Sequence, residues 1–293
     1  MRRMKVTVLN CLTAKGDGVA NDDAVGHNAS DGHADFWVID GATSVADRAY
    51  VPGAASDPAW FAHSLSTGLA EAVRAPQRTI DEALRVAISG VRDRYLAAVG
   101  RMESVPIYAW PLAALTFVRV AATEDGLTFA GLCLGDCPAF ARSAIWRPLW
   151  QPQENGDQPV YLRENLDRTQ LKQRIRQRRE EQHAMPSMGV VVPDPACVDY
   201  ATHIHFTSGP EARLVLMTDG FARLFQEYHL MAVDAVMTDL EAPGAAGTLL
   251  ARLRAAERPD EAGRRPLIYK NGDDATVLAV AFGHQASTPK ARI

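Results

Sequence analysis

Residues 36–45 read FWVIDGATSV, an apolar run that ends abruptly in an acid, a glycine and small polar residues. A continuous apolar run bounded by turn-forming residues predicts a buried strand, here over about 35–40. Asp40 stands where that strand ends. An ionised carboxylate is costly to bury without a partner, so this position calls for a specific chemical reason.

The whole chain has the composition of an ordinary globular protein, with 293 residues of which 47% are hydrophobic. Its net charge of −4 produces no field that would draw it to nucleic acid or to an acidic membrane. No apolar run approaches the roughly 20 residues that span a bilayer, and MRRMKVTVLN has no signal-peptide core. We therefore expect a cytoplasmic protein without nucleic-acid or membrane partners.

Four cysteines are few for this length, and the closest pair is spaced C-x3-C with no second pair to complete a zinc site. They are expected to be reduced thiols, most of them in the core: Cys11, Cys133, Cys137 and Cys197.

Further apolar runs predict a substantial sheet system. The sequence ATEDG predicts a hairpin between two of these strands, because Asp125-Gly126 favours a tight turn. The expected strands are 4–12, 35–40, 113–121, 127–134, 201–206, 212–218 and 275–283.

Two helices are expected after the second strand. Asp57 is a candidate N-cap before Pro58, and Thr79 with Glu82 forms a capping box at the start of the next helix. A third helical region at 229–256 is broken by APGAAG. The order strands, two helices, strands, helix, strand predicts a layered α+β fold rather than regular βαβ alternation.

The segment 141–200 fits this plan least well, because residues 163–182 carry seven Arg or Lys against four Asp or Glu. One interpretation is a solvated helix with a long surface loop. The other is a flap whose arginines receive an acidic or phosphorylated partner.

Acidic residues recur at the ends of the predicted strands. Each Asp-Gly alone is typical of a turn, so the argument depends on the whole set. Several ionised carboxylates brought together raise one another's pKa, and a hard cation such as Mg2+ or Mn2+ relieves their repulsion. The set comprises Asp22, Asp23, Asp40, Asp136, Asp219, Asp273 and Asp274.

The series NDDAVG, FWVIDGATS, LGDCPAF, MTDGF and DDATVLAVAF, spread over residues 21–282, resembles the motif series of the metal-dependent protein phosphatase 2C (PPM) family, of the bacterial type. The resemblance implies a four-layer α-β-β-α sandwich in which two antiparallel β-sheets are flanked by helices. It also implies one domain over 1–285 with an insertion or flap at about 141–200, followed by a disordered tail at 286–293.

The resemblance further implies a centre of two Mn2+ or Mg2+ ions. The ligands carried over are Asp23, Asp40, Asp219 and Asp273, the backbone carbonyl of Gly41, and Asp22 acting through metal-bound waters. Asp273 is preferred to Asp274 because it stands three residues before Thr276, as the family's ligand stands before its threonine.

The implied reaction is hydrolysis of phosphoserine and phosphothreonine in a protein substrate by a water activated between the two ions. Thr43 and Ser44, beside the site, need not form a phosphoenzyme.

Two positions depart from the family pattern near the substrate. Gly18 stands where many members carry a phosphate-holding arginine, and Lys15 or Arg48 is the expected substitute. Ala42 replaces a histidine that many members have, which leaves protonation of the leaving group to water or to His27 or His33 in the preceding loop.

A third ion in some members uses the hairpin aspartate, here Asp136, and a second acid whose place is taken by Arg223. Asp136 is therefore either a metal ligand or a hairpin-turn residue. His203 and His205 are expected to be ordinary strand residues.

Two other functions stay open on the sequence alone. One is a catalytically weak relative that binds a phosphoprotein or a regulatory partner. The other is a dimetal phosphoesterase acting on a small phosphorylated molecule. No heptad pattern or long apolar stripe predicts an oligomer.

Overall fold

The computed structural model describes residues 4–30, 32–152, 167–258 and 272–284. The expected tail at 286–293 lies outside the described residues. Within the described ranges, no helix is both long enough and apolar enough to cross a bilayer.

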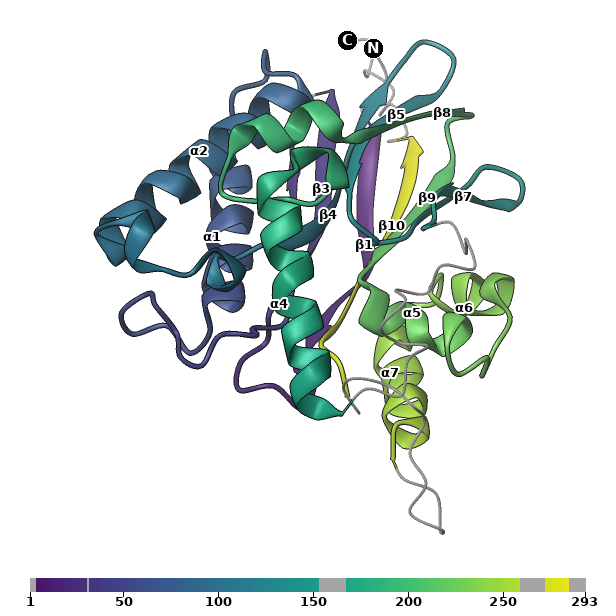
Figure 1. Cartoon of the computed structure of the whole chain (residues 1–293). Helices are drawn as coiled ribbons and strands as arrows, with labels where there is room; N and C mark the ends of the chain where they lie inside the picture. The colour runs from purple at the N-terminus through teal and green to yellow at the C-terminus, as the bar shows by residue number, and fades with distance from the viewer. Residues whose placement is uncertain (1–3, 31, 153–166, 259–271, 285–293) are drawn as a thin grey trace, which may run out of the picture.

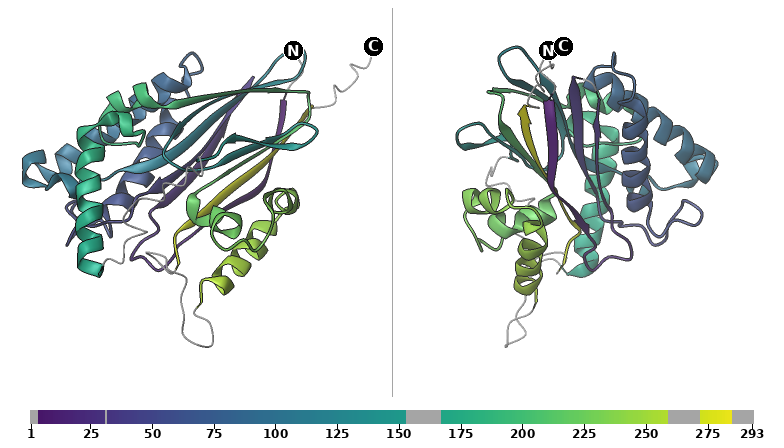
Figure 2. Two further views of the ribbon diagram at one scale, coloured as in Figure 1. Left: turned by 45° about the vertical axis from the view of Figure 1, so that its right-hand side comes forward. Right: turned by 180° about the vertical axis from the view of Figure 1, so that it is seen from behind.

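Two five-stranded antiparallel sheets pack face to face in the centre of the molecule (Figures 1 and 2). The first has the order β1-β10-β9-β6-β7 and the second the order β2-β3-β4-β5-β8. The strands of the first sheet are β1 Met4–Ala14, β10 Ala275–His284, β9 Ala212–Met217, β6 Ala139–Arg142 and β7 Trp146–Trp150. Those of the second are β2 Asp23–Ala29, β3 His33–Gly41, β4 Ala113–Ala122, β5 Leu127–Leu134 and β8 Thr202–Ser208.

Helices cover the outer faces of both sheets. The second sheet carries α1 Asp57–Ala72 and α2 Ile80–Val99, and the first carries α5 Asp219–Gln226, α6 Val233–Asp239 and α7 Ala245–Ala256. A further α-helix of the described residues, α4 Arg168–Ala184, stands in front of the sheets in the view of Figure 1 and packs against the short turn Ile107–Ala109. Short 3-10 turns lie at η1 Met102–Ser104, η2 Ile107–Ala109, η3 Pro186–Met188 and η4 Pro195–Tyr200.

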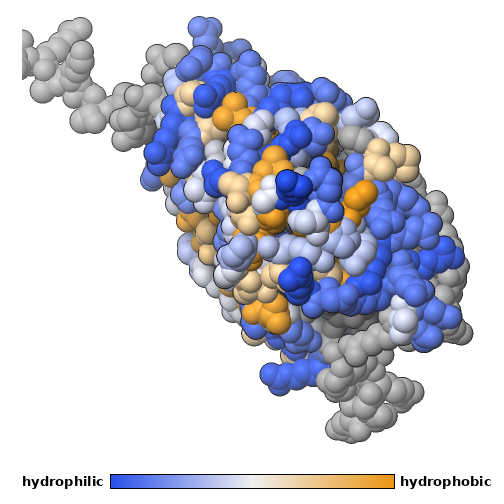
Figure 3. Space-filling view, turned by 60° about the vertical axis from the view of Figure 1, so that its left-hand side comes forward, coloured by the Kyte–Doolittle hydropathy of each residue, from blue (hydrophilic) through white to orange (hydrophobic). Residues whose placement is uncertain are grey.

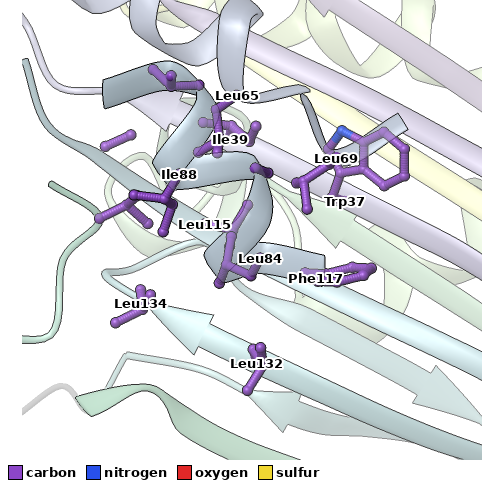
Figure 4. Close-up of a cluster of buried hydrophobic side chains, with 14 of the residues drawn as sticks. Trp37, Ile39, Leu65, Leu69, Leu84, Ile88, Leu115, Phe117, Leu132 and Leu134 are labelled. Carbon is purple, nitrogen blue, oxygen red and sulfur yellow. The ribbon is translucent and has the colours of Figure 1, made fainter. Parts of the chain in front are cut away.

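The apolar run in β3 is continuous because the strand is buried on both faces. Trp37 and Ile39 pack against α1 and α2 (Figure 4), whereas Phe36 and Val38 pack between the two sheets. Side chains alternate along a strand, so Asp40 follows Phe36 and Val38 on the face between the sheets.

Three apolar clusters fill the three interfaces between the layers. The first joins α1 and α2 to the second sheet, the next joins the two sheets, and the last joins the first sheet to α5, α6 and α7. The predicted four-layer sandwich is thereby confirmed. The side carrying α1 and α2 is mainly hydrophilic, with small separate hydrophobic patches (Figure 3), as expected of a solvent-facing layer.

The start of α1 differs from the sequence-based prediction. Ser56, rather than Asp57, is the N-cap, because its hydroxyl accepts the backbone N–H of Ala59. The Asp57 carboxylate instead accepts the backbone N–H groups of Tyr50 and Val51, and so closes the preceding loop.

Candidate metal centre

The acidic residues from both sheets meet at one end of the sandwich. Asp40 lies directly opposite Asp23 in the register of β3 with β2. On the facing sheet, Asp219 begins α5 immediately after β9, and Asp273 stands just before β10. Since β9 and β10 pair side by side, those two acids are also brought together.

A cavity of about 460 Å3 opens at this end, and four carboxylate-bearing residues line it. They are Asp40, Asp136, Asp219 and Asp273. Asp23 lies behind them, 1% exposed, where the Thr218 hydroxyl donates to it across 2.9 Å.

Two glycines make the close approach of these segments feasible. A Cβ on Gly41 would clash with the backbone carbonyl of Asp22, and a Cβ on Gly220 would clash with that of Asp274. Glycine next to Asp40 and next to Asp219 therefore has a packing reason besides the turn propensity visible in the sequence.

The electrostatics of the centre oppose its full ionisation. Burial raises the pKa of Asp40, and the charges of Asp219 and Asp23 raise it further. The Asp219 side chain is close enough to Asp40 to oppose the ionisation of its carboxyl group. Burial likewise raises the pKa of Asp23, and it raises that of Asp136 to about 7 with help from the charge of Asp219.

This chemistry fits hard divalent cations, which take oxygen ligands and would neutralise the clustered carboxylates. In the ranges that the structure covers, no group of three or more Asp, Glu, His or Cys side chains is arranged so that it could hold an ion as it stands. The residues therefore fit a divalent cation in donor type and charge, and their side chains would have to rotate to complete a set of ligands.

Asp274 has a structural role that separates it from Asp273. Its two oxygens accept the backbone N–H groups of Gly16 and Asp22, each across 2.7 Å. Asp22 in turn accepts the hydroxyl of Ser56. Asp273 lines the cavity, whereas Asp22 and Asp274 lie outside the lining.

The connection carrying Asp136 is not a hairpin, and that part of the sequence interpretation is wrong. β5 and β6 belong to different sheets, so residues 135–138 carry the chain from one sheet to the other. The hairpin was implied by the family resemblance, but β5 pairs with β4 and β8 while β6 pairs with β7 and β9. The inter-sheet connection places Asp136 in the cavity.

Arg223 holds a buried position beside the cavity. Its guanidinium donates to Asp273 across 3.1 Å and pairs with Glu227 at 3.2 Å. Arg223 thus occupies the position at which some members of the resembled family carry an acid for a third metal ion. Its positive charge neutralises part of the acidic charge of the centre.

The candidate phosphate-holding residues lie away from the cavity lining. The Lys15 ammonium donates to the carbonyl of Gly18, and the Arg48 guanidinium stacks over the ring of Tyr50. His33 is at the opposite end of β3 from Asp40, roughly 20 Å along the strand, and His27 lies toward the same end.

The basic helix α4 forms a wall of the cavity, to which it contributes Ile175, Arg178, Arg179 and Gln182. Arg179 donates to the carbonyl of Thr43 across 2.6 Å, and Arg176 donates to that of Val45 across 3.0 Å. Both acceptors belong to the loop that follows Asp40-Gly41. The expected helix therefore forms with most of its described side chains at least partly exposed, but one face is docked, and Arg179 on that face is only 7% exposed.

Comparison with known proteins identifies solved structures that share this fold. No family model and no curated protein matches the chain. The architecture nevertheless is that of the PP2C-type Ser/Thr phosphatases, as solved structures covering nearly the whole chain show.

Among them is the catalytic domain of the serine/threonine protein phosphatase PstP in complex with two manganese ions, with 13% identity and a TM-score of 0.54 over 97% of this chain and 100% of that one. PppA of Pseudomonas aeruginosa has 17% identity and a TM-score of 0.51 over 96% and 98%. RsbX in complex with magnesium has 10% identity and a TM-score of 0.50 over 96% of both chains.

Proposed function

We propose that this chain is a metal-dependent phosphatase that hydrolyses phosphoserine and phosphothreonine in proteins. The observation that carries the proposal is the convergence of Asp23, Asp40, Asp219 and Asp273 from two sheets on one acidic centre. These four side chains and the carbonyl of Gly41 would hold two Mn2+ or Mg2+ ions, with Asp22 contributing through water. Ions of these kinds accompany the similar folds of PstP and RsbX.

Bound ions would supply Lewis-acid activation of water and charge neutralisation during displacement at phosphorus. The chain's own residues prepare the place for them. Thr218 fixes the orientation of Asp23, and Asp274 ties the loop before β2 to the start of β10. Arg223 holds Asp273 from outside the cavity.

The cavity also favours a phosphorylated substrate. Its acidic floor faces a wall in which α4 contributes Arg178, Arg179 and Gln182. A phosphate group placed between bound cations and guanidinium groups would be neutralised on both sides.

The test is hydrolysis of a phosphothreonine peptide with Mn2+ and with EDTA. Because loss of an outer-shell partner already costs 10- to 100-fold, Asp219→Asn should lower kcat/KM by about 100-fold or more. Asp125→Asn, in the exposed β4–β5 turn, is the matched control and should retain activity. Hydrolysis that persists in EDTA and in Asp219→Asn would refute the proposal.

One alternative has a specific observation in its favour. The ion pair of Arg223 with Asp273 competes with metal for a proposed ligand. A protein that binds phosphorylated partners without hydrolysing them would show tight phosphopeptide binding and no turnover with any divalent ion.

A further inference from the structure

Two stripes of residues run along α4, and they face different surroundings. Lys172, Arg176, Arg179 and His183 are spaced four, three and four residues apart and share one face of the helix. Lys172 and Arg176 pair with Asp47 at 2.8 and 2.9 Å, and His183 lies 3.1 Å from the carbonyl of Trp110. Arg176 and Arg179 also bond to the loop after β3. These four residues, called the docking stripe below, fix the position and rotation of α4.

The neighbouring stripe points into the cavity. Ile175, Arg178 and Gln182 are spaced three and four residues apart, and all three line the acidic cavity. The rotation of α4 is set by the docking stripe, so the direction of the cavity stripe is set as well.

Arg178 differs from the other cations in contact with the centre. Arg179 is committed to Thr43 and Arg223 to Asp273. No hydrogen bond or ion pair joins Arg178 to another residue in the described ranges, and its side chain is exposed. Its positive charge reaches the floor of the cavity, where it lowers the pKa of Asp136 against the larger effect of burial.

We propose that Arg178 binds the phosphate of the substrate, in place of the cation that this chain lacks at Gly18. The inference rests on the proposed phosphatase function. A carboxylate-lined floor repels a phosphate dianion wherever bound metal does not neutralise it. A guanidinium presents paired N–H donors whose geometry matches phosphate oxygens, and Gln182, one turn further along the same stripe, offers a neutral amide donor.

The docking stripe gives this residue a defined distance from the metal ligands. Thr43, Val45 and Asp47 accept from α4 within seven residues of Asp40. Arg178 is thus held by the same short segment that carries a proposed metal ligand, although the two are 138 positions apart in the sequence.

The first experiment measures binding of inorganic phosphate to the Mn2+-loaded full chain by isothermal titration calorimetry. Since a hydrogen bond to a charged group contributes enough for tenfold or more in affinity, Arg178→Ala should weaken binding at least about tenfold. Arg178→Lys keeps the charge but loses the paired donors, so its phosphate affinity should lie between those of the parent and Arg178→Ala. Arg174→Ala removes the same charge one turn earlier, outside the cavity lining, and should bind phosphate like the parent.

Kinetics with a phosphothreonine peptide supply a second readout. Arg178→Ala should raise KM and the inhibition constant of phosphate together, while Mn2+ affinity stays unchanged. Unchanged phosphate affinity and KM in Arg178→Ala would overturn the inference, and so would an equal loss in Arg174→Ala.

The two experiments separate this inference from the proposed function. A parent protein that binds phosphate through Arg178 without turnover refutes the phosphatase proposal and supports the phosphate site. A parent that hydrolyses the peptide equally well with and without the Arg178 side chain supports the phosphatase and refutes the site.

Discussion

Asp40, which is partly exposed, and Asp274, which is buried, both lie near one end of the sandwich, but their carboxylates have different tasks. Asp40 faces other carboxylates and the cavity. Asp274 faces two backbone N–H groups. At the scale of single residues, the candidate metal centre thus combines carboxylates that line the cavity with a carboxylate, that of Asp274, that holds the surrounding backbone in place.

Asp274→Ala should therefore destabilise the fold rather than remove a metal ligand. It leaves the N–H groups of Gly16 and Asp22 without their charged acceptor, at a cost of about 3 kcal/mol or more in the free energy of unfolding. Urea denaturation in EDTA measures this cost, with the exposed Asp125→Ala as control. A loss below about 1 kcal/mol together with a collapse in Mn2+ affinity would reverse the roles of Asp273 and Asp274.

At the scale of elements, the docking of α4 depends on a histidine that must stay neutral. Burial lowers the pKa of His183 to about 4, from an ordinary value of 6.5. As the pH falls from about 6.5 to 4, the unfolded chain takes up the proton first, so the free energy of unfolding falls. The loss attributable to His183 is up to about 3 kcal/mol.

His183→Gln should remove this part of the acid sensitivity. Urea unfolding of the metal-free protein across that pH range gives the slope for each protein. His27→Gln, at an exposed position of β2, should keep the parent slope. An unchanged slope in His183→Gln would mean that the histidine is not buried against Trp110 as described.

Elements with strong local signals could be predicted from the sequence. The Thr79 and Glu82 capping box and the β4–β5 hairpin both form as expected. β2 was missed because DAVGHNA has no apolar alternation, and Gly26 is selected by the Trp37 ring packed against it. The missed β6 has only four residues, and β7 contains Pro148.

The candidate site likewise has features that could be predicted from the sequence and features that could not. The acids at strand ends could be found because a strand fixes where its last residue lies. Helix α5 was missed because its eight residues directly continue the run of β9. The position of α4 over the acids depends on contacts such as Arg179 with Thr43, 136 positions apart, which no local pattern encodes.

At the scale of the whole molecule, two halves of the sandwich bring like charges together, and metal should decide how stable that arrangement is. Ions that bind the folded chain alone raise the free energy of unfolding, by about 2.7 kcal/mol at a concentration of 100 Kd for one site. EDTA should reverse the increase, which thermal or urea unfolding would detect.

Asp40→Asn should change the stability of the fold in opposite directions in the metal-free and the Mn2+-loaded protein. In EDTA it removes a carboxyl group whose ionisation burial and the neighbouring acids oppose, so the variant should be at least as stable as the parent. With Mn2+ it should be less stable, because a ligand is lost. Equal destabilisation in both conditions would assign Asp40 a purely structural role.

The central claim is that the acids at the end of the sandwich form a dimetal centre, and a calorimetric titration of the full chain with Mn2+ tests it most directly. The account predicts two ions per chain, with at least one lost in Asp40→Asn and none lost in Asp125→Asn. No binding at millimolar Mn2+, or undiminished binding by Asp40→Asn, would contradict it.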